Sequence, residues 1–279
     1  MLKVGLPIAL AVIMFGMGLG LTVADFARVF SKPKAFLVGT VLQIICLPLL
    51  ALLVVMIFPM SAPFMVGMMI LAACPGGVTS NILTYISKAD VALSVSLTAV
   101  ISLVGFITVP LITGWALTNF MGEAAPELPI AKTMIGILLI TTVPVALGMI
   151  IRKVKPSMAD SAERIFGPLS IILFIAVVVG ALIQERANII PYIAETGIPT
   201  LVLNILTMGL AAAIAAFLAL PRNQQVAITL ECGLQNSTLG LAVAITILDR
   251  SDISVPIAVY GLLMLFTGFG YAMWRRRNA

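Results

Sequence analysis

The chain has 279 residues, of which 61% are hydrophobic and only 10% are charged. A soluble domain usually carries about 25% charged residues, so this composition excludes water-soluble enzymes, secreted scaffolds and nucleic-acid binders and indicates a protein embedded in lipid. The net charge of +5 is typical of basic membrane loops, and the absence of histidine excludes histidine-based proton relays, Ser-His or Cys-His nucleophile pairs and histidine metal sites.

Apolar stretches recur along the whole chain. A bilayer core about 30 Å thick needs about 20 apolar residues per helix, and nine stretches meet this requirement. We expect helices at residues 5–23, 35–58, 64–86, 90–118, 129–151, 167–183, 198–220, 225–248 and 253–274. The longest polar connections, at 24–34, 119–128, 152–165 and 184–197, are short. The sequence therefore predicts an all-α polytopic membrane protein with a single domain over residues 1–279.

The basic residues predict how the helices are oriented in the membrane. Cytoplasmic loops carry an excess of Lys and Arg. With the N-terminus outside, twelve basic residues lie in inside loops and four in outside loops. The inside set is Arg28, Lys32, Lys34, Lys88, Arg152, Lys153, Lys155, Arg164, Arg222, Arg275, Arg276 and Arg277, and the outside set is Lys3, Lys132, Arg186 and Arg250. We therefore expect a multi-pass inner-membrane protein with a cytoplasmic C-terminus.

The third stretch contains a sequence that does not favour a continuous helix. Residues 74–77 read Cys-Pro-Gly-Gly, and a proline followed by two glycines removes a backbone donor and adds backbone freedom. A break in a membrane helix is tolerated where the freed backbone groups line a cavity or bind a ligand. The N-termini of the resulting half-helices favour anions, and the unwound carbonyls favour cations such as Na⁺.

A short internal repeat relates the third and eighth stretches. Residues 77–83 align without gaps to residues 233–239, an offset of 156 residues. The two stretches are five helices apart and cross the membrane in opposite directions, as in the inverted repeats of secondary transporters. Stretches one to four then pair with six to nine, and the fifth has no mate.

One acidic residue lies where the bilayer makes charge costly. Glu231 follows the largely apolar run 226–230 and precedes Cys232, Gly233 and a run of amide and hydroxyl residues. A charge at mid-bilayer costs about 2.5–3.5 kcal/mol even on the mildest scales, so Glu231 is predicted to be a cation ligand or a proton site. Neutral oxygens that suit a hard monovalent cation are supplied by Gln43, Ser80, Asn81, Ser94, Thr98, Gln235, Asn236 and Ser237.

These residues together resemble the bile acid:sodium symporter family over essentially the whole chain. The motifs that carry the resemblance are Cys74-Pro75-Gly76-Gly77-Val78-Thr79-Ser80-Asn81, Ala89-Asp90-Val91-Ala92-Leu93-Ser94 through Thr98, and Glu231-Cys232-Gly233-Leu234-Gln235-Asn236-Ser237. The resemblance implies nine transmembrane helices, two of them discontinuous and crossing in mid-membrane. It also implies a core domain at about residues 35–118 and 198–274, and a panel domain at about residues 1–23 and 129–183.

The resemblance further implies two sodium sites that share one carboxylate. The first would comprise Ser80, Asn81, Ser94, Thr98 and Glu231. The second would comprise Gln43, Glu231 and Gln235 with the backbone carbonyls of Cys232 and Leu234. Two Na⁺ ions against one carboxylate leave excess positive charge, which gives a reason for an anionic substrate. The substrate-binding candidates are Val78, Thr79, Asn204, Asn236 and Ser237.

Two departures from the family pattern bear on the substrate. Members that bind bile acids often carry a His-Asn pair in the last helix, where this chain has Met264 and Leu265. Where relatives read Thr-Ala-Ser-Asn, this chain has Val78, Thr79, Ser80 and Asn81, which moves a hydroxyl by one position. These departures favour a small organic carboxylate, pantoate-like or a 2-oxo acid, over a bile acid or sterol conjugate.

Other classes of function remain open at this stage. An ion channel also needs polar breaks in mid-membrane, although the sequence shows no ring-forming filter motif. An intramembrane hydrolase needs an activated nucleophile, and the sequence offers no plausible base for one. We therefore expect a sodium-coupled symporter that works by alternating access in the lipid bilayer, with two Na⁺ ions, no further metal, no nucleic acid and no obligatory protein partner.

Overall fold

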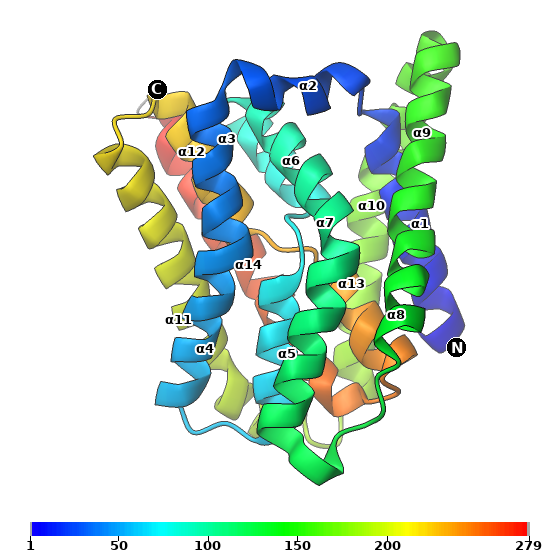
Figure 1. Ribbon diagram of the computed structural model, residues 1–279, viewed down its shortest axis with the longest axis vertical. Helices are drawn as coiled ribbons and strands as arrows, with labels where there is room; N and C mark the ends of the chain where they lie inside the picture. Colours follow the sequence, from blue (N-terminus) through cyan, green and yellow to red (C-terminus); the bar gives the residue numbers. More distant parts are fainter. Residues whose placement is uncertain (1, 278–279) are drawn as a thin grey trace.

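The computed structural model describes residues 2–277, with side chains for residues 4–27 and 32–277. All regular secondary structure in this part of the chain is helical (Figure 1). The α-helices are α1 Leu2–Leu19, α2 Val23–Ser31, α3 Pro33–Val41, α4 Leu47–Ile57, α5 Ala62–Ala73, α6 Val78–Ile86, α7 Val91–Ala116, α8 Ile130–Ile137, α9 Val143–Val154, α10 Pro156–Gln184, α11 Ile189–Phe217, α12 Arg222–Gly233, α13 Ser237–Leu241 and α14 Ser251–Arg277. Short π-helical turns are η1 Leu42–Cys46, η2 Leu117–Met121, η4 Leu138–Thr142 and η5 Ala242–Ile247, and η3 Gly122–Ala124 is a 3₁₀ turn.

Long apolar helices dominate the architecture. Among the described residues, six helices are long and apolar enough to cross a membrane, at Pro33–Ile57, Val91–Ala124, Ile130–Val154, Pro156–Gln184, Ile189–Phe217 and Ser251–Arg277. The other three predicted stretches form shorter helices, namely α1 and the interrupted pairs α5/α6 and α12/α13. Apolar side chains such as Leu49, Leu139 and Ile205 are more than half exposed on the outside of the bundle, as lipid contact requires.

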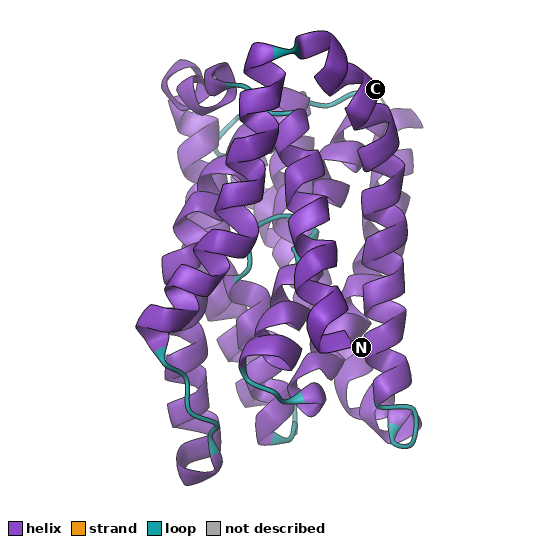
Figure 2. Ribbon diagram, turned by 90° about the vertical axis from the view of Figure 1, so that its right-hand side faces the viewer, coloured by secondary structure: helices purple, strands orange, loops and turns teal. Residues whose placement is uncertain are grey.

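Two helical runs are interrupted inside the bundle. α5 ends at Ala73 and α6 begins at Val78, at the predicted Pro-Gly-Gly sequence, while α12 ends at Gly233 and α13 begins at Ser237. Loop segments at mid-height in Figure 2 mark these interruptions. The two loops pair with each other: Gly77 N donates to Leu234 O at 3.0 Å, and Asn236 N donates to Pro75 O at 2.8 Å. This pairing satisfies backbone groups that would otherwise be unpaired within the membrane.

The pairing corrects the register of the internal repeat. The donors of its two hydrogen bonds are Gly77 and Asn236, and the acceptors are Leu234 and Pro75, so residues with the same part in the pairing are 159 residues apart. The offset of 156 expected from the sequence therefore differs by three residues from the one seen at the crossing. The half-helix starts at Val78 and Ser237 follow the same offset of 159.

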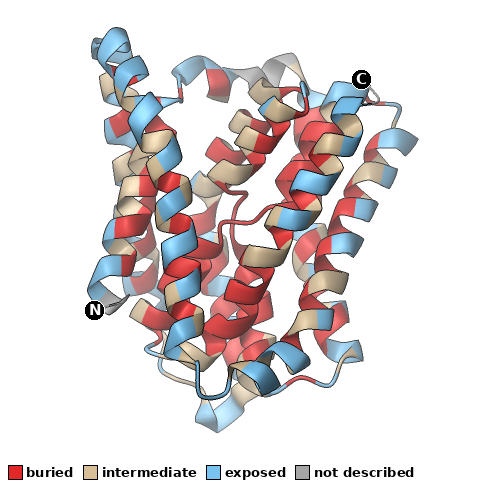
Figure 3. Cartoon of the chain, turned by 180° about the vertical axis from the view of Figure 1, so that it is seen from behind, coloured by how far each residue is buried: buried red, intermediate tan, exposed pale blue. Residues whose placement is uncertain are grey.

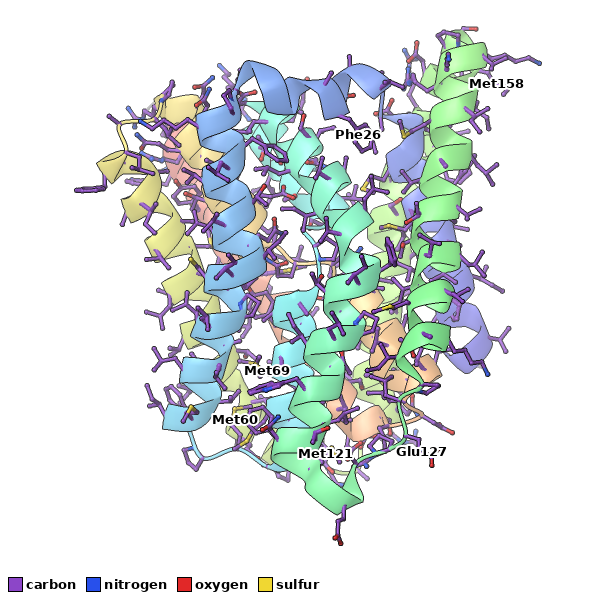
Figure 4. The ribbon with its side chains drawn as sticks, in the orientation of Figure 1. Phe26, Met60, Met69, Met121, Glu127 and Met158 are labelled. Atoms are coloured by element: carbon purple, nitrogen blue, oxygen red, sulfur yellow. The ribbon has the colours of Figure 1, made fainter. Side chains whose placement is uncertain are left out.

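The connections also contain more helix than expected. The predicted polar connection at 24–34 holds α2, and most of the connections at 152–165 and 184–197 belongs to α10 and α11. These segments carry charged residues, so hydropathy alone does not identify them, whereas an amphipathic helix at a membrane surface tolerates such residues. Phe26 extends from α2 toward the bundle (Figure 4), where it lines a cavity with Met17 and Ala99.

Two π-type turns lie just before prolines. η1 precedes Pro48 and η4 precedes Pro144. Proline has no N–H and crowds the carbonyl of the preceding turn, so the helix widens locally instead of continuing its regular bonds. Gln43 lies in η1 and is buried.

Packing joins helices across the whole bundle, and α10 contacts α14 as α7 contacts α8. α1 packs against α9 and α10, whereas α11 packs against α12 and α14, and α5 against α7 and α14. Buried residues concentrate around the interrupted helices (Figure 3). At one end of the bundle, Lys32 pairs with Asp90 at 2.5 Å and Lys34 donates to Leu218 O at 2.7 Å. This end also carries α2 and the C-terminus (Figure 1).

Candidate functional site

A fully buried carboxylate lies at the centre of the site. Glu231, near the C-terminal end of α12, is 0% exposed. Ser80 of α6 donates to its Oε2 at 2.7 Å, and Ser94 of α7 donates to the same oxygen at 2.9 Å. Thr98, one turn further along α7, donates to Oε1 at 2.5 Å. Three helices that are distant in sequence thus converge on one acidic group.

Asn81 completes this cluster. Its Oδ1 lies 2.8 Å from Ser94 Oγ and 3.4 Å from Thr98 Oγ1. The structure therefore brings together all five residues expected at the first sodium site. We call Ser80, Asn81, Ser94, Thr98 and Glu231 the carboxylate cluster.

The carboxylate cluster has more acceptor oxygens than protons. Each hydroxyl carries one proton, yet Ser80 Oγ also lies 2.7 Å from Gly77 O, and Thr98 Oγ1 lies 3.1 Å from Ser94 O. Among the described side chains, no Lys or Arg pairs with Glu231. A negative charge surrounded by surplus oxygen lone pairs fits a hard monovalent cation such as Na⁺.

The residues expected at the second sodium site form an adjacent group. Gln43 Nε2 lies 3.4 Å from Glu231 O and 3.5 Å from Gln235 Oε1, and Gln235 Nε2 donates to Cys232 O at 2.7 Å. Leu234 O accepts the crossing bond from Gly77 N and keeps a second lone pair. Gln43 Oε1 is buried and accepts no hydrogen bond from the described part of the chain, so this group also has an oxygen available for a cation.

Gly76 is a functional position that the site prediction missed. A Cβ atom at this residue would overlap Glu231 Oε1 and would lie 3.2 Å from Gln43 Nε2. Only glycine therefore leaves room for the carboxylate between the two predicted sites. The sequence signal was present in the Pro-Gly-Gly run, but it was interpreted only as a helix break.

Four of the five predicted substrate residues surround a small cavity at the crossing. Val78 and Thr79 line it from α6, and Asn236 and Ser237 line it from the loop and first turn of α13. Its volume is about 20 Å³, which holds roughly one water molecule. Thr79 Oγ1 and Ser237 Oγ are buried and have no hydrogen-bond partner among the residues that the structure describes. Unpaired buried hydroxyls at two half-helix N-termini suit the polar head of a ligand.

A larger cavity adjoins the carboxylate cluster. It lies between α1 and α10 on one side and α6 and α7 on the other, with a volume of about 350 Å³. Asn81, Val78 and Ser170 contribute to its wall, and Val78 and Ser170 also line the small cavity. This volume is at the lower end of the range for small-molecule sites. Asn81 thus borders both the carboxylate cluster and a ligand-sized space.

Asn204, the fifth predicted substrate residue, does not line either cavity. Its Nδ2 donates to Gly233 O at 2.8 Å and to Tyr260 Oη at 3.1 Å, while Tyr260 Oη donates to Gly233 O at 3.0 Å. Both side chains are fully buried. Asn204 and Tyr260 therefore hold the last carbonyl of α12. The site prediction missed Tyr260, although a tyrosine inside an apolar stretch usually needs a buried partner.

Comparison with known proteins identifies relatives over nearly the whole chain. The model of the sodium bile acid symporter family matches residues 7–191. The chain is 29% identical to the probable chloroplastic sodium/metabolite cotransporter BASS2 of Oryza sativa subsp. japonica, over 97% of this chain and 64% of the relative. It is 29% identical to the uncharacterized sodium-dependent transporter YocS of Bacillus subtilis (strain 168), over 92% of this chain and 78% of the relative. The chain thus spans less than two thirds of the length of the rice relative.

Proposed function

The chain belongs to the sodium bile acid symporter family, and from this premise we propose that it is a secondary transporter that couples sodium entry to uptake of an organic anion. The family and the relatives described above are named as transporters, so the protein is not an enzyme. Its long apolar helices make it a multi-pass membrane protein.

The observation that carries the proposal is the environment of Glu231. A fully buried carboxylate that accepts three hydroxyl bonds and has no cationic side chain among its described partners requires a counter-charge. A sodium ion supplies that charge. In this proposal Ser80, Asn81, Ser94, Thr98 and Glu231 hold one Na⁺. Gln43, Glu231 and Gln235 hold a second, together with the carbonyls of Cys232 and Leu234.

The same arrangement favours an anionic substrate. Two sodium ions exceed the single carboxylate by one positive charge, and the N-termini of α6 and α13 add their positive dipole ends. The unpaired hydroxyls of Thr79 and Ser237 lie at those N-termini. We assign them, with Asn236, to the head group of the substrate.

The cavity dimensions favour a small substrate. The adjoining space of about 350 Å³ suits a pantoate-like or 2-oxo carboxylate better than a bile acid or sterol conjugate, which remains the alternative. Met264 supplies an apolar wall to the small cavity, where the bile-acid-binding pattern has a polar pair. We therefore assign the small carboxylate as the substrate class.

Transport by alternating access requires two bodies that move relative to each other. We assign α1, α8, α9 and α10 to a panel domain and the remaining transmembrane helices to a core domain that contains both sodium sites. The proposed membrane arrangement has nine transmembrane segments, with the N-terminus outside and the C-terminus in the cytoplasm of an inner-membrane protein. Sodium binding from outside would order the crossing and favour the state that accepts the anion.

The test is uptake into proteoliposomes with an inward sodium gradient. A panel of radiolabelled small carboxylates and one bile acid should identify a saturable, sodium-dependent substrate. Glu231→Gln should abolish that uptake, and Glu127→Gln, an exposed acid at the opposite end of the bundle from α2 (Figure 4), should preserve it. Full sodium-dependent uptake by Glu231→Gln would overturn the assignment. Sustained sodium current without substrate saturation would instead indicate a channel.

A further inference from the structure

An open groove lies on the outside of the bundle, away from the sodium and substrate cavities. Its volume is about 610 Å³, and it lies between the last turns of α9, the start of α10 and the start of α2. The lining residues are Thr22, Val23, Ala146, Met149, Ile150, Arg152, Lys153 and Pro156. Most of this wall is apolar, and Val23 and Ile150 are more than half exposed. In a bilayer such a groove is filled by a hydrocarbon chain.

Basic residues lie at one end of the groove: Arg152 and Lys153 line it, and Lys155 lies two residues further along the chain. Arg152 binds the two acids of the neighbouring turns of α10, Asp160 and Glu163, and also donates to Leu19 O. One guanidinium balances only one of these two carboxylates, so the three side chains together keep one negative charge. Lys153 and Lys155 are exposed and form no ion pair with any side chain that the structure describes.

The two lysines directly follow the apolar part of α9. The apolar part of α9 ends at Ile151, and the next four residues read Arg-Lys-Val-Lys. Basic side chains at this level extend toward phosphate groups at the membrane surface. Met158, labelled in Figure 4, lies at this end of the α9/α10 pair, in the first turn of α10, and its side chain is exposed.

From this juxtaposition we propose that the groove is a binding site for an anionic phospholipid. One acyl chain lies along Ala146, Met149 and Ile150, and the phosphodiester lies on Lys153 and Lys155. A net-negative lipid is favoured over a zwitterionic one because the two ammonium groups form no ion pair with a described side chain and outnumber the one negative charge that Arg152 leaves on Asp160 and Glu163. The proposal concerns only the outer surface of the bundle and does not depend on the sodium ligands or the transported substrate.

The experiment is native mass spectrometry of the full chain in detergent, with phosphatidylglycerol or phosphatidylcholine of identical acyl chains. The unmodified protein should retain phosphatidylglycerol at least about tenfold more strongly than phosphatidylcholine, since each lysine near the surface contributes about 1 kcal/mol. Lys153→Gln/Lys155→Gln should lower phosphatidylglycerol retention to about the phosphatidylcholine level. Lys132→Gln, an exposed lysine at the opposite end of the α8–α9 run, is the matched control and should retain the preference.

Three further measurements make the result decisive. Ala146→Phe fills the apolar part of the groove and should weaken phosphatidylglycerol binding with both lysines present, whereas glycerol phosphate should not compete. Lys153→Arg/Lys155→Arg should keep the preference and exclude a folding defect. Equal retention of both lipids by the unmodified protein, unchanged retention by the glutamine double variant, or full competition by glycerol phosphate would overturn the proposal.

Discussion

Gly76 faces Glu231 so closely that any side chain at residue 76 would overlap the carboxylate oxygen Oε1. Gly76 lies in one crossing loop, and Glu231 lies in the last turn of the helix that precedes the other. The pairing of the two loops therefore determines where the acidic group lies relative to Ser80 and Thr98. Backbone geometry and cation chemistry are coupled at this contact.

Replacement of Gly76 should remove sodium binding. In Gly76→Ala the new methyl group displaces the Glu231 carboxylate from its hydroxyl partners, so sodium should no longer raise the thermal stability of the purified protein. Gly77→Ala is the matched control, because a Cβ there would meet its nearest neighbours at an ordinary 3.4 Å. A normal sodium-dependent stabilisation in Gly76→Ala would show that the carboxylate is free to move aside.

Loss of one hydroxyl should weaken sodium binding without unfolding the protein. Thr98→Val removes the 2.5 Å bond to Glu231 Oε1, and hydrogen bonds to charged groups contribute about 1.5–3 kcal/mol. The sodium concentration for half-maximal thermal stabilisation should rise about tenfold or more. Thr113→Val on the same helix removes a buried hydroxyl that has no partner in the described residues, and it should leave the sodium titration unchanged. Identical titrations for the two variants would contradict the proposed role of Thr98.

The unpaired hydroxyl of Ser237 should serve the substrate and not the fold. Removing a buried hydroxyl without a partner costs no hydrogen bond, so Ser237→Ala should keep or slightly raise the free energy of unfolding. Its apparent KM for the transported anion should rise about threefold to tenfold, the equivalent of one neutral hydrogen bond, while the sodium titration stays constant. A large loss of stability would mean that Ser237 has a structural partner.

Asn204 should act on the helix end instead of the substrate. Asn204→Leu removes one of the two donors to Gly233 O and should lower the free energy of unfolding by about 1–3 kcal/mol, and Tyr260→Phe by about 0.5–1.5 kcal/mol. Thr207→Val, one turn along α11, removes only a bond to its own helix and should have a smaller effect. Chemical unfolding in detergent measures the differences. A raised KM in Asn204→Leu with unchanged stability would restore Asn204 as a substrate ligand.

Local features of the sequence predicted local features of the structure. The Pro-Gly-Gly run at residues 75–77 predicted the break between α5 and α6, because proline and glycine act on the backbone of their own turn. The second break has no proline, and its exact position at Leu234–Asn236 follows from the pairing with the first. The repeat offset of 156 likewise differs by three residues from the one at the crossing, which the pairing sets. α2 and the early start of α10 at Pro156 were missed because charged amphipathic helices escape a hydropathy criterion.

By itself, the sequence determined that the chain lies in lipid, that the third apolar stretch is broken from residue 74, and that an acidic residue follows the apolar run that ends at residue 230. Each depends on composition or on one turn of backbone. Only the tertiary structure decided which oxygens meet that acid, since Ser80 and Thr98 lie 151 and 133 residues away from it. It also decided that Gly76 must lack a side chain and that Asn204 holds a carbonyl. The strength of a hydrogen bond depends on tenths of an ångström in the distance between donor and acceptor. The pairing of two distant loops sets those distances around Glu231.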